Sequence, residues 1–159
     1  MIRLTVNLIA LIGLVHLLTG CNGPLGPIPG GKLSGATSDE AILDWSFAAD
    51  VEVIQLETQP GDPHSVNTWV GVHNGKLYIP TSLIRGDAEP NNRDWVRHVI
   101  ADPRVRLRIN DTIYPATASR VMDQAQVNAV RNQLLLKYAE EPTEHSSAAW
   151  LFVMESRSQ

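Results

Sequence analysis

Cysteine is nearly absent from this chain: Cys21 is the only one among 159 residues. A single cysteine excludes an intramolecular disulfide framework and a cysteine-rich metal site. Cations are also in the minority, with 13 Lys and Arg against 17 Asp and Glu, giving a formal net charge of −4. Such a domain lacks the basic surface that neutralises nucleic-acid phosphates, so we expect no nucleic-acid partner.

Several motifs of catalysis are missing as well. The sequence contains no Gly-x-Ser-x-Gly elbow, no phosphate-binding loop and no His-x-x-x-His pair. The histidines beyond residue 20 are scattered, at positions His64, His73, His98 and His145. The pattern predicts no metal ligand, no side-chain nucleophile and no catalytic base.

The longest apolar run, Leu4 to Leu18, follows Arg3 and is too short to span a bilayer comfortably, at roughly 15 residues. It ends in Leu18-Thr19-Gly20-Cys21, which resembles the lipobox of bacterial lipoprotein signal peptides. The resemblance implies cleavage before Cys21, its lipidation, and attachment to a membrane of the cell envelope on the extracytoplasmic side. The alternative is an uncleaved anchor with an incidental cysteine. Because no twin arginine is present, export would deliver an unfolded chain.

This interpretation divides the chain into three parts. Residues 1–20 are the signal peptide, residues 21–36 are the lipidated cysteine and a flexible Gly/Pro-rich tether, and residues 37–159 form one domain. A capping box at Thr37–Glu40 predicts a helix that leads into Trp45. Asn74-Gly75 predicts a type I′ hairpin between strands at 66–73 and 76–81.

The rest of the domain alternates strands and helices. Further strands are predicted at 51–58, 104–110, 112–122 and 149–155, and a short helix at 92–101. A second capping box at Asp123 predicts a helix whose apolar stripe is Val127, Val130, Leu134 and Tyr138. The order predicts a mainly β, α+β fold: an antiparallel six-stranded barrel with two or three flanking helices.

Arginines alternate with apolar residues in the strand at 104–110. Arg104, Arg106 and Arg108 share one face, and Val105, Leu107 and Ile109 the other. The arginine face fits a solvated outer surface or an anion site, and the sequence leaves both open.

Three short motifs in the domain resemble those of a known superfamily. Trp95–Val105 contains a helix followed by Ala-Asp-Pro-Arg-Val, Ile113–Ala116 reads Ile-Tyr-Pro-Ala, and Lys137-Tyr138 ends the last helix. Over roughly residues 50–157 the chain resembles the split β-barrel flavin-binding superfamily, most of all its deazaflavin-dependent nitroreductase branch. The pyridoxamine 5′-phosphate oxidase-like proteins are wider relatives.

The resemblance implies a homodimer that binds FMN, FAD or the deazaflavin F420 and transfers a hydride or two electrons to a small organic substrate. FMN is the expected cofactor. Haem is a further candidate, with His64 or His98 as axial ligand. The residues matched to a cofactor site are His64, Asn67, Thr68, Thr81, Ser82, Arg85, Trp95 and His98. Arg85 would clamp a phosphate, and Trp95 and His98 would support the cofactor.

Other interpretations stay open at these positions. The hydroxyl groups fit ordinary strand-end turns equally well, and for Trp95 packing of the helix onto the barrel is favoured over a cofactor role. The chain also departs from the family pattern, because His64 stands near a position where relatives carry Arg or Lys. The alternative function is a lipid-anchored, non-catalytic domain that uses the barrel groove to bind a small heterocycle or to dimerise.

Overall fold

The computed structural model describes residues 23–82, 92–142, 146 and 148–158. One antiparallel sheet dominates it, joined by a short parallel strand, and its order is β3-β2-β6-β7-β8-β5-β4 with β1 beside β7. The strands are β1 (Ala36–Thr37), β2 (Val53–Thr58), β3 (His64–Trp69), β4 (Gly71–His73), β5 (Lys76–Pro80), β6 (Arg104–Ile109), β7 (Thr112–Arg120) and β8 (Leu151–Ser156). The mainly β architecture predicted from sequence is confirmed.

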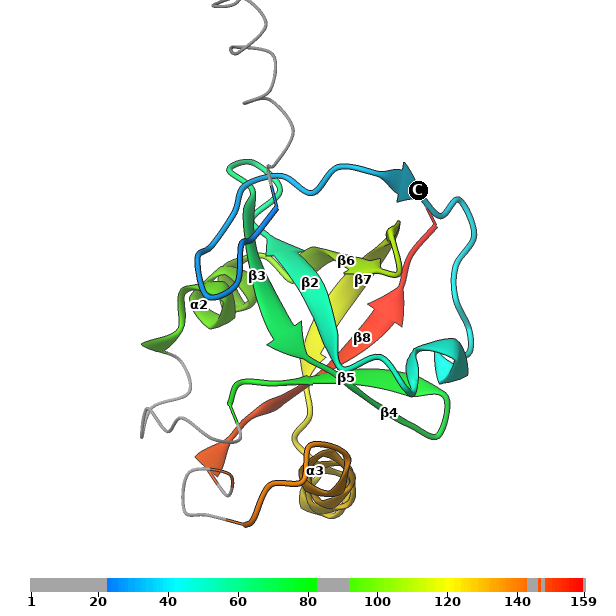
Figure 1. Ribbon diagram of the computed structural model, residues 1–159, viewed down its shortest axis with the longest axis vertical. Helices are drawn as coiled ribbons and strands as arrows, with labels where there is room; N and C mark the ends of the chain where they lie inside the picture. The colour runs from blue at the N-terminus through cyan, green and yellow to red at the C-terminus, as the bar shows by residue number, and fades with distance from the viewer. Residues whose placement is uncertain (1–22, 83–91, 143–145, 147, 159) are drawn as a thin grey trace, which may run out of the picture.

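The sheet curls because its two ends are consecutive in the chain. β3 stands at one end of the order and β4 at the other, yet only Val70 separates them in sequence. The strands therefore wrap around a common core, as Figure 1 shows. The inward faces supply that core, which includes Leu56, Leu77 and Leu107 at 0% exposure.

The strand count differs from the predicted six. The segment 66–73 divides at Val70 into β3 and β4, and the two-residue β1 was not predicted. Alternation cannot reveal such a break, because every residue from 65 to 73 continues an extended pattern. The other strands lie where their patterns place them, including β8, which is central between β7 and β5 as expected.

The predicted hairpin is confirmed. β4 and β5 pair antiparallel from Gly71 opposite Tyr78 to His73 opposite Lys76. The two turn residues, Asn74 and Gly75, have φ of +50° and +72°. Asn and Gly tolerate this left-handed region, which a type I′ turn requires at both positions.

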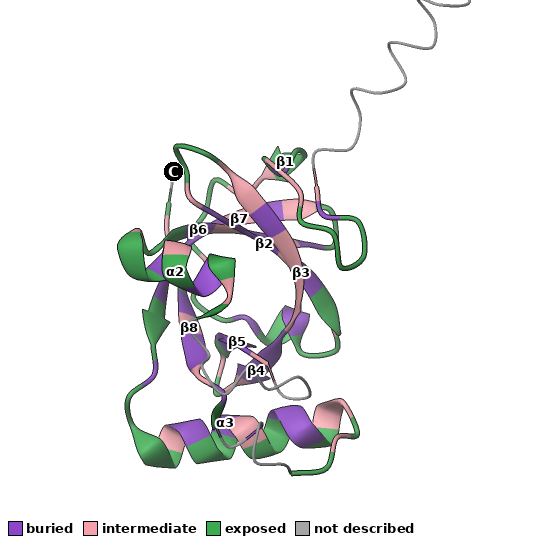
Figure 2. Cartoon of the chain, turned by 90° about the vertical axis from the view of Figure 1, so that its left-hand side faces the viewer, coloured by how far each residue is buried: buried purple, intermediate pink, exposed green. Residues whose placement is uncertain are grey.

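Two helices flank the barrel, α2 (Asp94–Ala101) and α3 (Gln124–Lys137), on different sides of it in Figure 2. Asp123 caps α3 as predicted, since its carboxylate accepts from the amide of Gln126 at 2.7 Å. The stripe of α3 packs on a second apolar cluster against β5 and β8. Among the described residues, neither helix combines the length and apolarity that crossing a bilayer demands.

The helix predicted after Thr37 is wrong. Thr37 ends β1, and Ser38 donates its amide to the carbonyl of Ile113 at 2.8 Å. The Ser38 hydroxyl bonds the Glu40 carbonyl instead of capping a helix. Only one turn of 3₁₀ helix, η1 (Ser46–Ala48), forms in this stretch. Pairing with β7 satisfies the backbone here, and local propensity yields to that tertiary contact.

The segment predicted as a flexible tether also differs from expectation over residues 23–36. Leu33 is buried at 1% exposure, and the backbone of Gly30 pairs with Ser65 on the edge strand β3 through two bonds of 2.8 Å. A Cβ on Gly30 would lie 2.2 Å from the Gly23 carbonyl carbon, so only glycine fits there. We call residues 23–36 the N-terminal strap. It covers an otherwise open sheet edge.

Candidate functional site

A small open groove lies between β3, the end of β5 and the start of α2. Its volume is about 200 Å³. Its lining residues are Asn67, Thr68, Trp69, Pro80, Thr81, Ser82 and Arg93. Four of the residues expected from sequence at a cofactor site, Asn67, Thr68, Thr81 and Ser82, are thus brought to one place.

Backbone hydrogen bonds fix two of these side chains. Thr81, at 5% exposure, donates its amide to the Trp150 carbonyl at 2.9 Å, and its hydroxyl accepts from the Trp150 amide at 3.0 Å. This exchange extends the β5–β8 pairing by one residue. The side-chain amide of Asn67 donates to the Gly26 carbonyl of the strap at 2.9 Å. Both groups have structural partners, so they enter the groove already oriented.

Trp69 supplies an aromatic wall, and α3 holds it in place. Its indole stacks on the ring of Tyr138 with centroids 4.1 Å apart and planes inclined by 4°. The Tyr138 hydroxyl accepts from the Val70 amide at 2.9 Å and donates to the Glu52 carbonyl at 2.5 Å. Burial raises the pKa of Tyr138 to about 12, so the phenol stays protonated and neutral near neutral pH.

Lys137 secures the same bend. Its ammonium donates to the carbonyls of Val51 at 2.6 Å and Val70 at 2.9 Å, and burial lowers the pKa of Lys137. The Lys-Tyr pair at the end of α3 therefore fixes the chain where β3 passes into β4. Trp69 lies directly before that bend, so the contacts that fix the bend also hold Trp69 in place.

Arg93 is the cation of the groove, and sequence reasoning missed it. The residue is half-buried and directly precedes α2, with its backbone in an extended conformation (φ −79°, ψ 134°). Within the part of the chain that the structure describes, no carboxylate lies within ion-pair distance of its guanidinium. The dipole of the helix N-terminus adds to its positive charge, and Asp94 in the first turn is paired with Arg97. The sequence feature that could have identified Arg93 was its position in the first turn of the predicted helix 92–101.

His64 and His98 form a separate pair outside the described lining of the groove. Their rings meet edge to face with centroids 5.1 Å apart, and Nδ1 of His98 lies 3.1 Å from the Thr58 hydroxyl oxygen. Burial first, and repulsion from His64 second, lower the pKa of His98. The expectation that these histidines join Asn67 and Thr81 at one site is not met by the geometry.

Trp95 and Arg85 were also expected at the cofactor site. Trp95 is 5% exposed and packs edge to face on Phe152, with ring centroids 5.4 Å apart. The structure therefore places Trp95 in the barrel core, which agrees with the alternative that it packs the helix onto the barrel. Arg85 lies outside the described residues.

Comparison with known proteins concerns the fold of this chain. No protein-family model matches the chain, and no curated protein matches it. Among solved structures, an F420-H2 dependent reductase (FDR-A) is similar at 16% identity over 78% of this chain and 100% of the other, with a TM-score of 0.50. A NimC/NimA family protein from Clostridium acetobutylicum is similar at 15% identity over 69% and 75%, also with a TM-score of 0.50. A structure described as a domain-swapped dimer is similar at 20% identity over 67% and 81%, with a TM-score of 0.51.

At these identities the likeness concerns the fold. The chain has the split-barrel architecture of these proteins, which agrees with the fold expected from its own motifs. It is thus a split-barrel protein with an aromatic and cationic groove. Its particular activity has to be argued from that groove.

Proposed function

We propose that this protein is a flavin-binding oxidoreductase attached to the cell envelope through Cys21. The observation that carries the proposal is the joint presence of the Trp69 indole and the Arg93 guanidinium in one groove. A flavin nucleotide joins a planar aromatic ring to a phosphate, and the groove offers a partner to each. The fold shared with an F420-H2 dependent reductase supports the same assignment.

The donor set suits the phosphate half well. Arg93 can form two parallel hydrogen bonds to phosphate oxygens, and the first turn of α2 adds backbone amides and a positive dipole end. The basic residue that relatives carry near His64 is missing here. Arg93 offers the same charge from a different segment of the chain.

The volume indicates what a second subunit would add. About 200 Å³ is below the roughly 300–1,000 Å³ of typical small-molecule sites. The described residues of one subunit therefore hold only part of a flavin, and we propose that the protein works as a homodimer whose partner completes the groove. The domain-swapped dimer among the similar structures supports this view.

When bound, the flavin supplies the hydride or two-electron chemistry. The residues of this chain bind and orient it: Trp69 would pack on the ring, and Arg93 would hold the phosphate. Asn67 and Thr81, fixed by their backbone bonds, would keep the edges of the groove in position. No side chain is assigned as nucleophile or base, because orientation is the main requirement of hydride transfer.

The export route bears on the cofactor, and the exposed residues of the strap bear on the location. An unfolded chain exported by the general route would take up its cofactor outside the cytoplasm, which favours FMN or FAD over F420. Near the proposed lipidation site, Leu25 and Ile28 of the strap are 74% and 62% exposed. These side chains would lie close to the lipid surface once Cys21 is acylated, which supports the anchored arrangement.

A second candidate function has one observation in its favour. Asn67 and Thr81 already satisfy backbone groups, which leaves the groove with few polar side chains free to take a ligand. A non-catalytic domain that only binds a heterocycle would need only a few such polar groups.

One titration tests the main proposal. The full-length chain in non-ionic detergent is titrated with FMN, FAD, F420 and haem, and binding is followed by absorbance and by melting temperature. Saturable binding of one flavin with a matching rise in melting temperature is expected. The bound flavin is then reduced with dithionite, and its reoxidation by a nitroaromatic or quinone acceptor, faster than that of free reduced flavin, separates the enzyme from the binding domain. Absence of binding by all three flavins would refute the proposal.

A further inference from the structure

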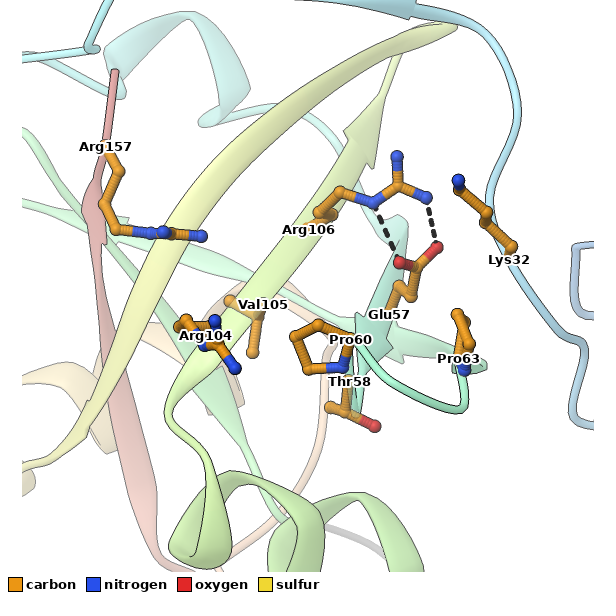
Figure 3. Close-up of a pocket in the computed structure, with 9 residues that line it drawn as sticks. All are labelled: Lys32, Glu57, Thr58, Pro60, Pro63, Arg104, Val105, Arg106 and Arg157. Atoms are coloured by element: carbon orange, nitrogen blue, oxygen red, sulfur yellow. Dashed lines mark hydrogen bonds and ion pairs between the residues drawn. The ribbon is translucent and has the colours of Figure 1, made fainter. Parts of the chain in front are cut away.

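A second cavity, of about 310 Å³, lies on the outer side of β2 and β6 and shares no lining residue with the groove. Its lining residues are Lys32, Glu57, Thr58, Pro60, Pro63, Arg104, Val105, Arg106 and Arg157. Four of the nine are cationic and one is acidic, in a chain that is acidic overall. Figure 3 shows these side chains surrounding one space.

Tertiary structure assembles the four cations from three distant segments. Arg104 and Arg106 occupy alternate positions on β6 and share its outward face. The strap brings Lys32, because Leu33 beside it donates its amide to Glu57 at 2.5 Å. The end of β8 brings Arg157, whose amide bonds the Pro115 carbonyl at 2.9 Å and whose Nε bonds the Ala116 carbonyl at 3.2 Å.

Two of the four charges are neutralised by carboxylates of this chain. Glu57, at 4% exposure, accepts from Nε of Arg106 at 2.8 Å and from its Nη2 at 2.5 Å. Arg104 pairs with Asp102 at 2.5 Å, and its hydrogen bonds are the main reason that the pKa of Asp102 falls to about 2. Each acid thus forms its ion pair with one arginine, while Arg157 acts on Asp102 only through its more distant charge.

Lys32 and Arg157 have no such partner. Among the described residues, no carboxylate lies within 4.0 Å of either side chain. They line opposite sides of the cavity in Figure 3. Like charges gathered around a concave, partly apolar surface raise the local potential and attract anions from solution.

We propose that this cavity binds a small organic anion with two acidic groups, one held by Lys32 and the other by Arg157. Two acidic groups match two unpaired cations on opposite walls. Pro60 and Pro63 give the cavity an apolar wall for the carbon skeleton between them. The volume is in the range of small-ligand sites, roughly 300–1,000 Å³. The site is independent of the flavin groove and stands whether or not a flavin binds.

The test uses the organic anions succinate and citrate as probes on the full-length chain in non-ionic detergent, at constant ionic strength. Calorimetry and melting temperature are expected to show saturable binding of at least one probe, while acetate has no effect at the same concentration. Lys32→Gln and Arg157→Gln should each weaken binding about tenfold, the loss of one charge-assisted contact. Arg97→Gln, which removes a cation from the exposed face of α2, is the matched control and should bind as wild type.

Three results would overturn the proposal: no saturable binding of either probe, unchanged affinity in both Lys32→Gln and Arg157→Gln, or loss of binding in Arg93→Gln. The last would assign the anion to the flavin groove. Lys32 is exposed and its substitution leaves the barrel intact, so that variant decides the question if Arg157→Gln fails to fold. Arg157→Lys, which keeps the charge, should recover part of the affinity.

Discussion

The indole of Trp69 lies flat on the phenol of Tyr138, with planes 4° apart and ring centroids separated by 4.1 Å. The Tyr138 hydroxyl accepts a hydrogen bond from the amide of Val70, the residue after Trp69. Tyr138 and Val70 are 68 positions apart in the sequence. One helix end therefore orders both the bend between β3 and β4 and the aromatic wall of the groove.

Removing the phenol should loosen that wall. Tyr138→Ala is expected to reduce FMN affinity about threefold to tenfold, in line with about 0.5–1.5 kcal/mol for an aromatic pair. Tyr138→Phe keeps the stack and loses only the hydroxyl bonds, so its affinity should stay near wild type while its melting temperature falls. Equal FMN affinity in Tyr138→Ala and wild type, measured by fluorescence titration, would show that Trp69 needs no support.

Arg93 should distinguish phosphorylated from unphosphorylated flavin. Arg93→Gln is expected to weaken FMN binding at least about tenfold, because a charge-assisted pair with phosphate is lost. Riboflavin has no phosphate, so its affinity should be the same in the variant and the wild type. A parallel fall for both ligands would mean that Arg93 shapes the groove and does not bind phosphate.

Glu57 should be a large contributor to stability. It is 4% exposed and holds both Arg106 and the Leu33 amide of the strap. Glu57→Gln leaves the half-buried guanidinium without its counter-charge, so we expect the free energy of unfolding to drop by about 3 kcal/mol. Asp102→Asn, which breaks an exposed pair of carboxylate and arginine, should cost far less, because water screens that pair. Urea unfolding of the two variants compares them directly, and similar losses would contradict the prediction.

His98 should make the fold sensitive to mild acid. Its pKa is lowered from 6.5, so the unfolded chain binds a proton more readily than the folded one. Stability is then full above pH 6.5 and declines as the pH falls from 6.5 through the lower pKa of the folded state. His98→Gln should remove this part of the pH dependence of the melting temperature.

His64 offers a check on the cause. Its charge is the second reason for the lowered pKa of His98, after burial. His64→Gln should therefore raise the pKa of His98 toward its ordinary value, as followed by NMR titration of the ring protons. A pKa of His98 that is unmoved by His64→Gln would leave burial and the charge of Arg97 as its causes.

Cys21 should determine attachment to the membrane. Cys21→Ser removes the thiol that the proposed lipid would occupy, so the variant should lose label from radioactive fatty acid and leave the membrane fraction. The groove is unaffected by this change, and flavin affinity should stay as in wild type. A labelled, membrane-bound Cys21→Ser protein would refute the lipobox interpretation.

Local chemistry made much of the fold predictable. Asn74-Gly75 defines its own turn, Asp123 caps the helix that follows it, and the alternation along β6 separates the buried Val105 from the outward Arg106. Each of these features depends on residues within a few positions of one another. Where a local signal competed with a distant partner it failed, as at Thr37, whose capping box yields to pairing with β7.

The candidate site was predictable only in part, for a similar reason. Strand β3 and the end of β5 were identified from motifs, and their hydroxyl and amide groups do meet in the groove. His64 is at the far end of β3, where strand direction carries it away from Thr81 and toward α2. Arg93 carried no motif at all.

The sequence by itself determined most of the strands, the Asn74-Gly75 turn and the two helices, because periodicity and capping are properties of neighbouring residues. The split-barrel class followed from the resemblance that its short motifs carry. The tertiary structure alone decided that the strap closes over β3, that Arg93 and Trp69 line one groove, and that Lys32 and Arg157 share a cavity. Those pairs are separated by tens of residues, and only the curling of the sheet at Val70 and the pairing of β8 bring them within reach.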